Sequence, residues 1–428
     1  MEPTKIAVIG AGYVGLTTAA CFASLGHDVL CADIDPQRVA TLQQGDLPIY
    51  EPGLSELVRA GVEAGRLEFV LGAANAVVGR SFVYLCVPTP QGFDGAADLS
   101  YLEAAAKEIA AVVEPGAVVV NKSTVPVGSA RLVEGFLDRN DVSVVSNPEF
   151  LREGSAVGDF LHPDRVVIGG DDLDAAARVA TLYDAIDAPV MLTDPASAET
   201  IKYVSNAYLA TKISFVNAVA AVCEAVDANV SDVVAAMGMD NRIGSGFLSP
   251  GPGFGGSCFP KDVRALIHIS ESAGYNFSLL RGVLVVNDEQ FDRVVDKVHQ
   301  LIGPDLVGVS VAAWGLAFKA GTDDLRASPA LEVIQRLVAR GATVRAHDPA
   351  IDAGRQIAEG LEVVADGYAA CEDADVLVVL TEWEDFRTMD LAKVRGSMRR
   401  PLVVDARNLL DRSELQEFGF TSLGIGRN

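Results

Sequence analysis

The stretch Gly10-Ala11-Gly12-Tyr13-Val14-Gly15 decides the fold class of this chain. It follows an apolar run, Ile6–Ile9, that is typical of a buried strand, and it opens a segment, Tyr13–Leu25, that is typical of a helix. In such a turn the first glycine allows a sharp change of direction, the second lets the backbone approach a pyrophosphate, and the third lets helix and strand pack closely. The sequence therefore predicts a dinucleotide-binding turn, with an ordinary glycine-rich strand-to-helix turn as the alternative.

The end of the next strand indicates the kind of dinucleotide. Asp33 closes the run Val29–Ala32 and stands 18 residues after Gly15. A carboxylate there can accept a hydrogen bond from a ribose 2′-hydroxyl, whereas it would repel a 2′-phosphate. We therefore expect NAD rather than NADP as the cofactor, although Arg38 lies close enough in the sequence to keep NADP open.

Alternating strands and helices continue to about residue 190. Amphipathic or alanine-rich segments such as Tyr13–Leu25 and Leu102–Val113 separate the apolar runs. This alternation predicts βαβ units and a mainly parallel sheet covered on both faces. The runs expected to form strands are Ile6–Ile9, Val29–Ala32, Phe82–Val87, Val118–Asn121, Val142–Ser146 and Val166–Gly169.

The pattern changes in the middle of the chain. The alanine-rich segment Pro195–Asp227 has no Gly or Pro after its first residue, and at ~1.5 Å per residue it would form a helix of roughly 50 Å. A helix of that length serves as a spine between two domains, as a subunit contact, or as both. Further helices are expected at Ser231–Met237, Pro260–Ala273 and Arg281–Ile302.

The strand–helix alternation returns after Pro304, and it echoes the beginning of the chain. Gly341, Val344 and Asp348 repeat the spacing of Gly26, Val29 and Asp33. The expected fold class is α/β: two Rossmann-like, doubly wound parallel-sheet domains joined by a long central helix and a helical middle region. The expected domains are residues 1–194, 195–303 and 304–428. The returning segments are Leu306–Ala312, Ala330–Arg340, Thr343–Ala346, Val376–Leu380 and Leu402–Val404.

Length and charge limit the possible functions. With 428 residues the chain is long enough for two or three domains. Half of the residues are hydrophobic and 21% are charged, which is typical of a globular protein and argues against disorder. The net charge of −24 disfavours binding to nucleic acids or to anionic membranes. An anionic small molecule would need a local cluster of Lys and Arg.

The six cysteines form no CxxC pair, which indicates a reducing compartment. The uncharged stretch Ile6–Gly26 resembles a membrane span or a signal sequence, but four glycines interrupt it. A buried strand, turn and helix explain this stretch better. We expect a cytoplasmic protein, and we expect no metal site.

The strongest local signal is Gly251-Pro252-Gly253-Phe254-Gly255-Gly256-Ser257-Cys258-Phe259-Pro260-Lys261-Asp262, whose glycines expose backbone amides to a ligand. Pro260 suits the first position of a helix, so Cys258 would stand just before a helix N-terminus and beside Lys261. Both features lower the pKa of a thiol and favour the nucleophilic thiolate. Asp262 would lie one turn further on. The alternative, a buried structural cysteine, is the interpretation that we adopt for the other five.

Two pairs of polar residues have the spacing that places side chains on one helix face. Glu149 and Glu153 would form such a pair if a helical turn begins after Pro148, and paired carboxylates can divide acid and base work. Lys202 and Asn206 would form another, and an ammonium beside a carboxamide can bind an oxyanion. For both pairs the alternative is a solvated surface.

Several other segments are candidates for ligand binding. Lys122–Ser129 ends a strand, at the sheet edge where doubly wound folds bind ligands. Arg242, Lys319 and Arg407 are further basic candidates, each more typical of a surface charge when taken singly.

Taken together, these segments resemble the UDP-glucose/GDP-mannose dehydrogenase family, and most closely its members that oxidise UDP-glucose. The resemblance spans nearly the whole chain. It implies an N-terminal NAD-binding domain, a helical middle that forms a homodimer, and a C-terminal domain that binds the UDP-sugar. The matching segments are Gly10–Gly15, Leu47–Leu54, Lys122–Val127, Asn147–Gly154, Lys202 with Asn206, Gly253–Asp262, Gly315–Lys319 and Thr381–Trp383.

The resemblance implies a four-electron oxidation of a sugar C6 alcohol to a carboxylate, with two NAD and one water per turnover. Cys258 would attack the intermediate aldehyde to form a thiohemiacetal, which the second oxidation converts into a thioester. Lys202 and Asn206 would stabilise the oxyanions, and Asp262 with a bound water would assist removal of the alcohol proton.

In hydrolysis of the thioester, Glu149 would be the acid and base that helps a water molecule to attack. Thr124 would help to hold that water. Phe318, Lys319 and Arg407 would hold the uracil and the diphosphate. The residues expected to bind NAD are Gly10, Gly12, Tyr13, Val14, Gly15, Asp33, Arg38, Pro88, Thr89, Ser123, Thr124, Glu153, Lys261 and Arg326. The residues expected to bind substrate are Glu149, Phe150, Leu151, Lys202, Asn206, Arg242, Phe247, Leu248, Ser249, Gly253, Phe254, Gly255, Phe318, Lys319 and Arg407, with Arg242 reaching the site of the other subunit.

The sequence departs from the family pattern at two places, and it leaves open two other substrates and one other function. Ala327 stands where many relatives have Glu, and Trp314–Lys319 replaces a second GxGxxG turn, so a second NAD site is not expected. The alternative substrates are GDP-mannose and UDP-N-acetyl-mannosamine. A catalytically silent, NAD-binding regulatory protein is the remote alternative, and loss of Cys258, Lys202 or Asp262 would have been its signature.

Overall fold

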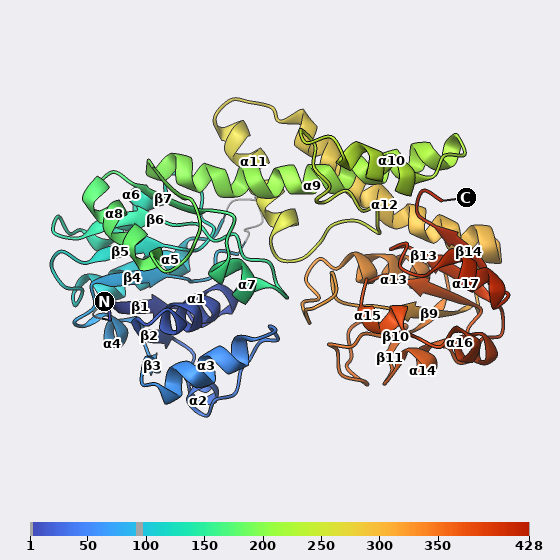
Figure 1. Ribbon diagram of the computed structural model, residues 1–428, viewed down its shortest axis with the longest axis horizontal. Helices are drawn as coiled ribbons and strands as arrows, with labels where there is room; N and C mark the ends of the chain where they lie inside the picture. Colours follow the sequence, from blue (N-terminus) through green and yellow to red (C-terminus); the bar gives the residue numbers. More distant parts are fainter. Residues whose placement is uncertain (1–2, 91–96, 428) are drawn as a thin grey trace. The chain divides into compact units, whose positions relative to one another are not determined.

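The computed structural model describes residues 3–90 and 97–427. These residues form two compact units, and the division between the units falls between Ser205 and Asn206 (Figure 1). The first unit is built on an eight-stranded sheet of order β3-β2-β1-β4-β5-β6-β7-β8. Neighbouring strands in it run parallel except β6 and β7, which are antiparallel. Its strands are β1 (Lys5–Ile9), β2 (Asp28–Asp33), β3 (Leu67–Leu71), β4 (Phe82–Leu85), β5 (Val118–Asn121), β6 (Ser143–Ser146), β7 (Val166–Gly170) and β8 (Val190–Thr193).

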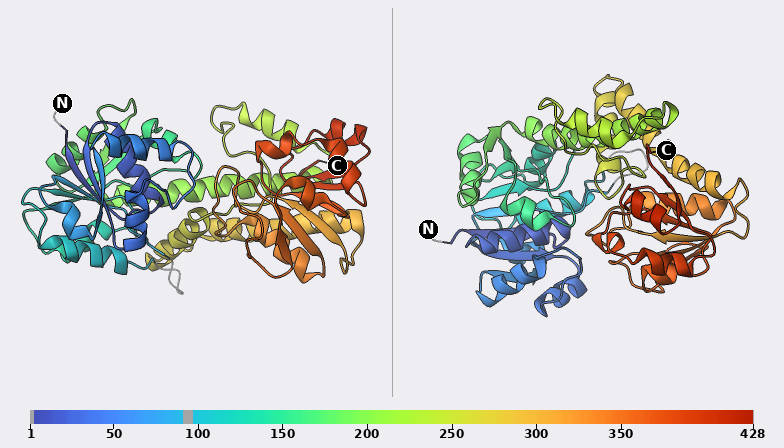
Figure 2. Two further views of the ribbon diagram at one scale, coloured as in Figure 1. Left: turned by 90° about the horizontal axis from the view of Figure 1, so that it is seen from below. Right: turned by 45° about the vertical axis from the view of Figure 1, so that its right-hand side comes forward.

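Helices cover both faces of this sheet, because successive side chains of a strand point to opposite faces. Ile6 and Val8 of β1 pack in one apolar cluster with α1, α2, α3, α7 and α8, whereas Ala7 and Ile9 pack in another with α4, α5 and α6. Figure 2 shows the ribbons of helices on both faces of this sheet. These clusters form the two cores of the unit. The helices are α1 (Tyr13–Ser24), α2 (Pro36–Gln43), α3 (Leu54–Glu63), α4 (Ala73–Val77), α5 (Ser100–Ala110), α6 (Ser129–Leu137), α7 (Ala156–Leu161) and α8 (Leu173–Ala180).

The strand order reverses direction beside β1, because β2 and β4 lie on its opposite sides. In open parallel sheets, ligands bind at the carboxyl ends of the strands at such a point. The loops after β1, β2, β4, β5 and β6 all begin at this edge. The loop after β1 is the glycine turn, β2 ends with Asp33, and the loops after β4, β5 and β6 carry Thr89, Thr124 and Glu149.

The helix α9 (Pro195–Ala225) has 31 residues and begins where the sequence predicts. It ends two residues earlier than expected, because Asp227 adopts a left-handed backbone conformation and Ala228 N donates to the Cys223 carbonyl, a closing motif of helices. The helices α10 (Val230–Gly238), α11 (Phe259–Ser272) and α12 (Ser278–Ile302) follow in the second unit.

The second unit contains a parallel sheet of order β11-β10-β9-β12-β13-β14. The α/β class with two parallel sheets and a long central helix is thereby confirmed. The strands are β9 (Ser310–Trp314), β10 (Thr343–His347), β11 (Leu361–Val363), β12 (Val376–Val379), β13 (Leu402–Asp405) and β14 (Thr421–Gly424), and the helices are α13 (Pro329–Ala339), α14 (Gly367–Cys371), α15 (Glu384–Arg387), α16 (Leu391–Ser397) and α17 (Arg412–Glu417).

Some boundaries differ from the expectation. The strand expected at Leu306–Ala312 is β9, which starts four residues later, because Val307 N donates to the Asp305 side chain and Gly308 turns the chain with a positive φ. Sequence analysis also missed β3, β8, β11 and β14. These four strands are the edges of the two sheets, where an apolar run is least necessary.

Candidate active site

The glycine turn after β1 has the shape that a dinucleotide pyrophosphate requires. Gly10 has φ +99°, and a Cβ there would lie 2.6 Å from the Cys86 carbonyl oxygen. A Cβ on Gly15 would collide with the Gly10 carbonyl oxygen, whereas around the Cβ position of Gly12 no atom lies within 4 Å. The turn is therefore tight where helix and strand pack and open at Gly12, which fits close approach of a pyrophosphate.

Asp33 lies beside this turn. Its Oδ2 accepts a hydrogen bond from Ala11 N at 2.8 Å and pairs with Arg38 Nη1 at 3.1 Å, and its Oδ1 accepts from Asp35 N at 3.0 Å. The carboxylate therefore fixes the turn and stands at the carboxyl end of β2. These positions fit the ribose of NAD.

The loops after β4 and β5 are joined to each other at the same sheet edge. Thr89 Oγ1 donates to the Thr124 carbonyl at 2.8 Å, and Ser123 Oγ donates to the Val87 carbonyl at 2.7 Å. These bonds bring together three residues that sequence analysis expects to bind NAD.

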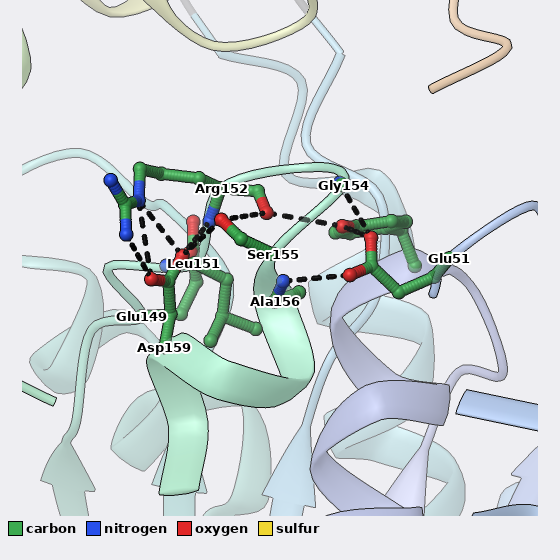
Figure 3. A network of polar contacts seen from close by, with 9 residues as sticks. Glu51, Glu149, Leu151, Arg152, Gly154, Ser155, Ala156 and Asp159 are labelled. Carbon is green, nitrogen blue, oxygen red and sulfur yellow. Dashed lines mark hydrogen bonds and ion pairs between the residues drawn. The ribbon is translucent and has the colours of Figure 1, made fainter. Parts of the chain in front are cut away.

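The loop after β6 contains no helical turn, so the conditional pairing of Glu149 and Glu153 on one helix face is wrong. Glu149 Oε2 accepts from Leu151 N at 2.6 Å, and Arg152 N donates to Asp159 Oδ2 at 2.8 Å (Figure 3). These backbone amides thus donate to side-chain carboxylates, whereas in a helix they would donate to backbone carbonyls. The helix begins only at Ala156, with α7.

Glu51 is a buried residue that sequence reasoning missed as part of the site. Its Oε2 accepts from Gly154 N at 2.6 Å and from the Tyr13 hydroxyl, and its Oε1 accepts from Ala156 N at 2.8 Å (Figure 3). Burial raises the pKa of Tyr13 well above its ordinary value, so its hydroxyl stays a donor. Glu51 therefore ties the dinucleotide turn to the loop that follows Glu149. Its position in the family-like segment Leu47–Leu54 was the available signal.

Lys202 and Glu149 form a buried ion pair. Lys202 Nζ lies 2.9 Å from Glu149 Oε1, and the two side chains are only 3% and 4% exposed. The ammonium also lies 5.5 Å from the centre of the Phe150 ring. Lys202 is therefore not a solvated surface lysine, and its charge acts where water screens little.

Cys258 stands at the N-cap of α11, just before the helix as predicted, but Phe259 takes the first position that was predicted for Pro260, and Pro260 takes the second. The Asp262 amide donates to the Cys258 carbonyl at 2.8 Å, which places Asp262 one turn on. The structure describes all six cysteines and joins none of them in a disulfide, and among the six Cys258 alone is partly exposed. By contrast, burial raises the pKa of Cys21, Cys86 and Cys371 to about 12, which keeps these thiols protonated and unreactive.

The buried carboxylate of Asp262 is held from two sides. Asn206 Nδ2 donates to its Oδ2 at 2.6 Å, and Lys261 Nζ lies 2.6 Å from its Oδ1. Asn206 lies four residues after Lys202 on α9, so one helix presents an ammonium and a carboxamide one turn apart.

Three amide side chains of the helical region position the glycine-rich loop, and sequence analysis missed all of them. Asn287 Oδ1 accepts from Phe254 N at 2.8 Å, and its Nδ2 donates to the Phe254 carbonyl at 3.1 Å. Asn217 accepts from Gly251 N, and Gln290 donates to the Gly251 carbonyl. Such amides in a helical pattern give no local signal of their distant partner.

The glycine-rich loop also packs against residues that follow the strands of the second sheet. A Cβ on Gly256 would lie 2.9 Å from the Phe318 ring, and one on Gly251 would lie 3.1 Å from Arg407 Nη1. Arg407 donates to the Phe318 carbonyl at 3.3 Å, and Lys319 Nζ lies 5.6 Å from the Phe318 ring centre. Phe318, Lys319 and Arg407 thus gather near the loop at one sheet edge.

Other expected residues have local partners. Arg326 pairs with Asp324, and Arg242 pairs with Asp240 on an exposed turn after α10. The contact of Arg242 with another subunit stays a prediction. No helix in the described part of the chain is long and apolar enough to cross a membrane.

A dinucleotide-type turn at one sheet, together with aromatic and cationic side chains at the strand ends of a second, is typical of a protein that binds nucleotides. The chain belongs to the UDP-glucose/GDP-mannose dehydrogenase family. The family's NAD-binding domain matches residues 4–187, its central domain residues 196–289 and its UDP-binding domain residues 312–412. NAD is therefore its cofactor.

Known proteins of this family match the whole chain. The chain is 46% identical over 446 residues to the UDP-glucose 6-dehydrogenase of Pseudomonas aeruginosa, covering 99% of this chain and 97% of that one. It is 45% identical to UDP-glucose 6-dehydrogenase TuaD of Bacillus subtilis, covering 99% and 93% of the two chains. The solved structure of a UDP-glucose dehydrogenase from Pyrobaculum islandicum superposes with a TM-score of 0.90 at 37% identity, covering 100% of this chain and 98% of that one.

Proposed function

We propose that this enzyme oxidises UDP-glucose to UDP-glucuronate, consuming two NAD and one water per turnover. The observation that carries the proposal is Cys258 at the N-terminus of α11, with Asp262 one turn on and held by Asn206 and Lys261. A simple alcohol dehydrogenation needs no nucleophile, whereas retention of an intermediate aldehyde does.

The first oxidation needs a base for the C6 hydroxyl proton and a group that stabilises the alkoxide. Asp262, through a water, takes the proton, and Lys202 with Asn206 stabilises the oxygen. NAD, when bound at the glycine turn, accepts a hydride in each of the two oxidations. The buried position of Lys202 supports this role, because solvent screens its charge little and its interaction with an oxyanion is correspondingly strong.

The second half of the reaction is covalent. The Cys258 thiolate adds to the aldehyde carbon to give a thiohemiacetal, and loss of a hydride from that carbon gives a thioester. Water then attacks the thioester carbon, the carbon–sulfur bond breaks, and the thiolate returns. One water proton passes to Glu149, and the product acid releases the other. The position of Cys258 before a helix N-terminus supports a thiolate as nucleophile.

The substrate and the assembly are part of the same proposal. The relatives named as UDP-glucose 6-dehydrogenases, at 45–46% identity, favour UDP-glucose over GDP-mannose or UDP-N-acetyl-mannosamine. Phe318, Lys319 and Arg407 are proposed to hold the uridine diphosphate, since their clustering provides a local positive site on an acidic protein. A homodimer is proposed through α9.

The proposal is tested by following NADH formation with each of the three nucleotide sugars in turn. We expect two NADH per UDP-glucose consumed and no free aldehyde. A progress curve that stops at one NADH per sugar excludes the covalent route, and greater activity with another sugar corrects the substrate. No NADH with any sugar would favour the silent regulatory protein.

A further inference from the structure

A small polar cavity lies in the first unit, where β5 and β6 end and α9 passes them. The space that it leaves to the centre of a water-sized molecule is about 10 Å³, and its walls include Asn121, Thr124, Ser146, Glu199 and Lys202. A single water molecule needs about 10–15 Å³ of such space. The cavity therefore suits one water molecule and is too small for a sugar or a nucleotide.

Asn121 is the unusual residue of this wall. It is the last residue of β5 and is only 1% exposed, and neither Oδ1 nor Nδ2 has a hydrogen-bond partner within residues 3–90 and 97–427. The three preceding residues of the strand are valines, which bury no polar side-chain atoms. A buried carboxamide without a protein partner is unfavourable unless another molecule supplies its hydrogen bonds.

Glu199, on the same wall, has its hydrogen bonds within the protein. Its Oε1 accepts from Ser146 Oγ and Ala130 N, both at 2.9 Å, and its Oε2 accepts from Gly128 N at 2.6 Å. Its carboxylate is thus satisfied and does not need to bind a ligand. Asn121, by contrast, can both donate a hydrogen bond to a guest molecule and accept one from it.

Two residues with proposed catalytic roles line the cavity. Lys202 lines it three residues after Glu199 on α9, and Thr124 lines it from the loop after β5. Lys202 also pairs with Glu149 at 2.9 Å. A water bound in the cavity would therefore lie beside the Lys202 ammonium, whose ion-pair partner is the proposed base.

We propose that this cavity supplies the water that hydrolyses the Cys258 thioester and that Asn121 binds and orients this water. The inference rests on the proposed function. The water oxygen bonds to the thioester carbon as the carbon–sulfur bond breaks, one water proton passes to Glu149, and the thiolate of Cys258 leaves. Asn121 accepts a hydrogen bond from the water or donates one to it, and it exchanges no proton.

The test is Asn121→Val, which continues the valines of β5 and removes both polar atoms. In rapid mixing with NAD and UDP-glucose, the variant should form two NADH per subunit at nearly the wild-type rate, and then turn over at least about tenfold more slowly. Intact-protein mass spectrometry should show a uridine-diphospho-sugar acyl adduct on Cys258. Hydroxylamine, a nucleophile that does not need the water site, should release the adduct as a hydroxamate and restore NADH formation.

Val120→Ala is the matched control, because it perturbs the buried neighbour in the same strand without changing polarity. It should keep turnover within about twofold and accumulate no adduct. Asn121→Ala is the second variant and should behave as Asn121→Val does. Turnover of Asn121→Val within twofold of wild type, or slow turnover without an adduct, overturns the proposal, and so does failure of both variants to fold.

The same experiment separates this proposal from the function on which it rests. If wild-type enzyme forms only one NADH per sugar, the covalent function has failed, whatever Asn121 does. If wild-type enzyme forms two NADH and the Asn121 variants accumulate no adduct, only the water site has failed.

Discussion

Lys202 and Glu149 form an ion pair in the interior, with Nζ 2.9 Å from Oε1. Both side chains are almost completely buried, so removal of one partner takes this counter-charge from a buried charged group. In the proposed reaction Lys202 must stabilise an oxyanion and Glu149 must accept a proton from water. The two events are compatible, because a Glu149 that gains a proton releases the Lys202 charge to the substrate oxygen.

Glu149→Gln is therefore expected to lower both stability and activity. The free energy of unfolding should fall by about 3–5 kcal/mol, because the buried Lys202 loses its counter-charge. Turnover should fall at least about hundredfold, because the variant lacks the proton acceptor for hydrolysis. Urea denaturation and NADH formation measure the two effects.

The double variant Glu149→Gln with Lys202→Met serves as the control for this pair. It removes both charges and should recover part of the lost stability without recovering activity. A single Glu149→Gln variant as stable as wild type, with turnover within tenfold, would contradict the role of the pair.

Glu51→Gln tests the connection between the dinucleotide turn and the loop that follows Glu149. The amide can no longer accept from Tyr13, Gly154 and Ala156 together, so the turn loses its support. We expect the KM for NAD to rise about tenfold, the equivalent of ~1.4 kcal/mol, with a smaller change in the KM for the sugar nucleotide. Glu56→Gln, in the exposed first turn of α3, is the matched control and should leave both values unchanged. Equal increases in both KM values would indicate general damage.

Stability should also depend on pH through Glu199. Burial raises the pKa of this carboxyl above its ordinary value, so the folded protein holds the proton more tightly than the unfolded chain. Its contribution to the free energy of unfolding is therefore greatest below the unfolded pKa of about 4.3 and is lost as the pH rises through the folded pKa.

Comparison of wild type with Glu199→Gln isolates this contribution, because glutamine does not titrate. The difference between their free energies of unfolding, wild type minus variant, should shrink from pH 4.5 to pH 7.5 in urea denaturation. A difference that grows over this range would show that the folded protein lowers the pKa instead.

Local patterns in the sequence predicted the features that depend on neighbouring residues. The glycine turn, Asp33 at the end of β2 and Cys258 before α11 are each encoded within about 20 residues, and the structure places them as expected. The helical turn after Pro148 was a wrong prediction although its competitors are also local: Glu149 accepts the Leu151 amide, and Asp159, seven residues after Arg152, accepts the Arg152 amide.

Long-range contacts account for the rest of the site. Glu51 meets Gly154 across 103 residues, and Asn287 meets Phe254 across 33. Neither residue has a neighbour in the sequence that marks it as a partner. Asn121 is likewise recognisable only when the walls of its cavity are known. A single sequence therefore gives the residues that carry chemistry more readily than those that hold them in place.

The proposed homodimer makes a prediction about α9. Val204, Tyr208, Phe215 and Val222 are each about half exposed or more, and their spacing places them near one face of the helix. Tyr208→Glu combined with Phe215→Glu should dissociate the dimer, so that light scattering falls from twice 45.0 kDa to 45.0 kDa at micromolar concentration. Phe418→Glu, at another exposed aromatic residue, should remain dimeric. Wild-type protein of 45.0 kDa with full activity would exclude the dimer.

Cys258→Ser tests covalent catalysis directly. Serine differs little from cysteine in volume, so a thiol that only packs would tolerate the change. Serine is, however, a poor nucleophile in this position, because its hydroxyl is almost wholly protonated near neutral pH. A helix N-terminus and Lys261 cannot lower the pKa of a hydroxyl far enough to change this. Turnover should fall by about three orders of magnitude or more, while NAD and UDP-glucose, whose phosphates contact other groups, still raise the melting temperature as in wild type.

Cys223→Ala, at a buried cysteine, should keep turnover near wild type. A Cys258→Ser enzyme that keeps more than about a tenth of wild-type turnover, a loss of only ~1.4 kcal/mol, would remove the thioester from the mechanism, and with it the need for a hydrolytic water.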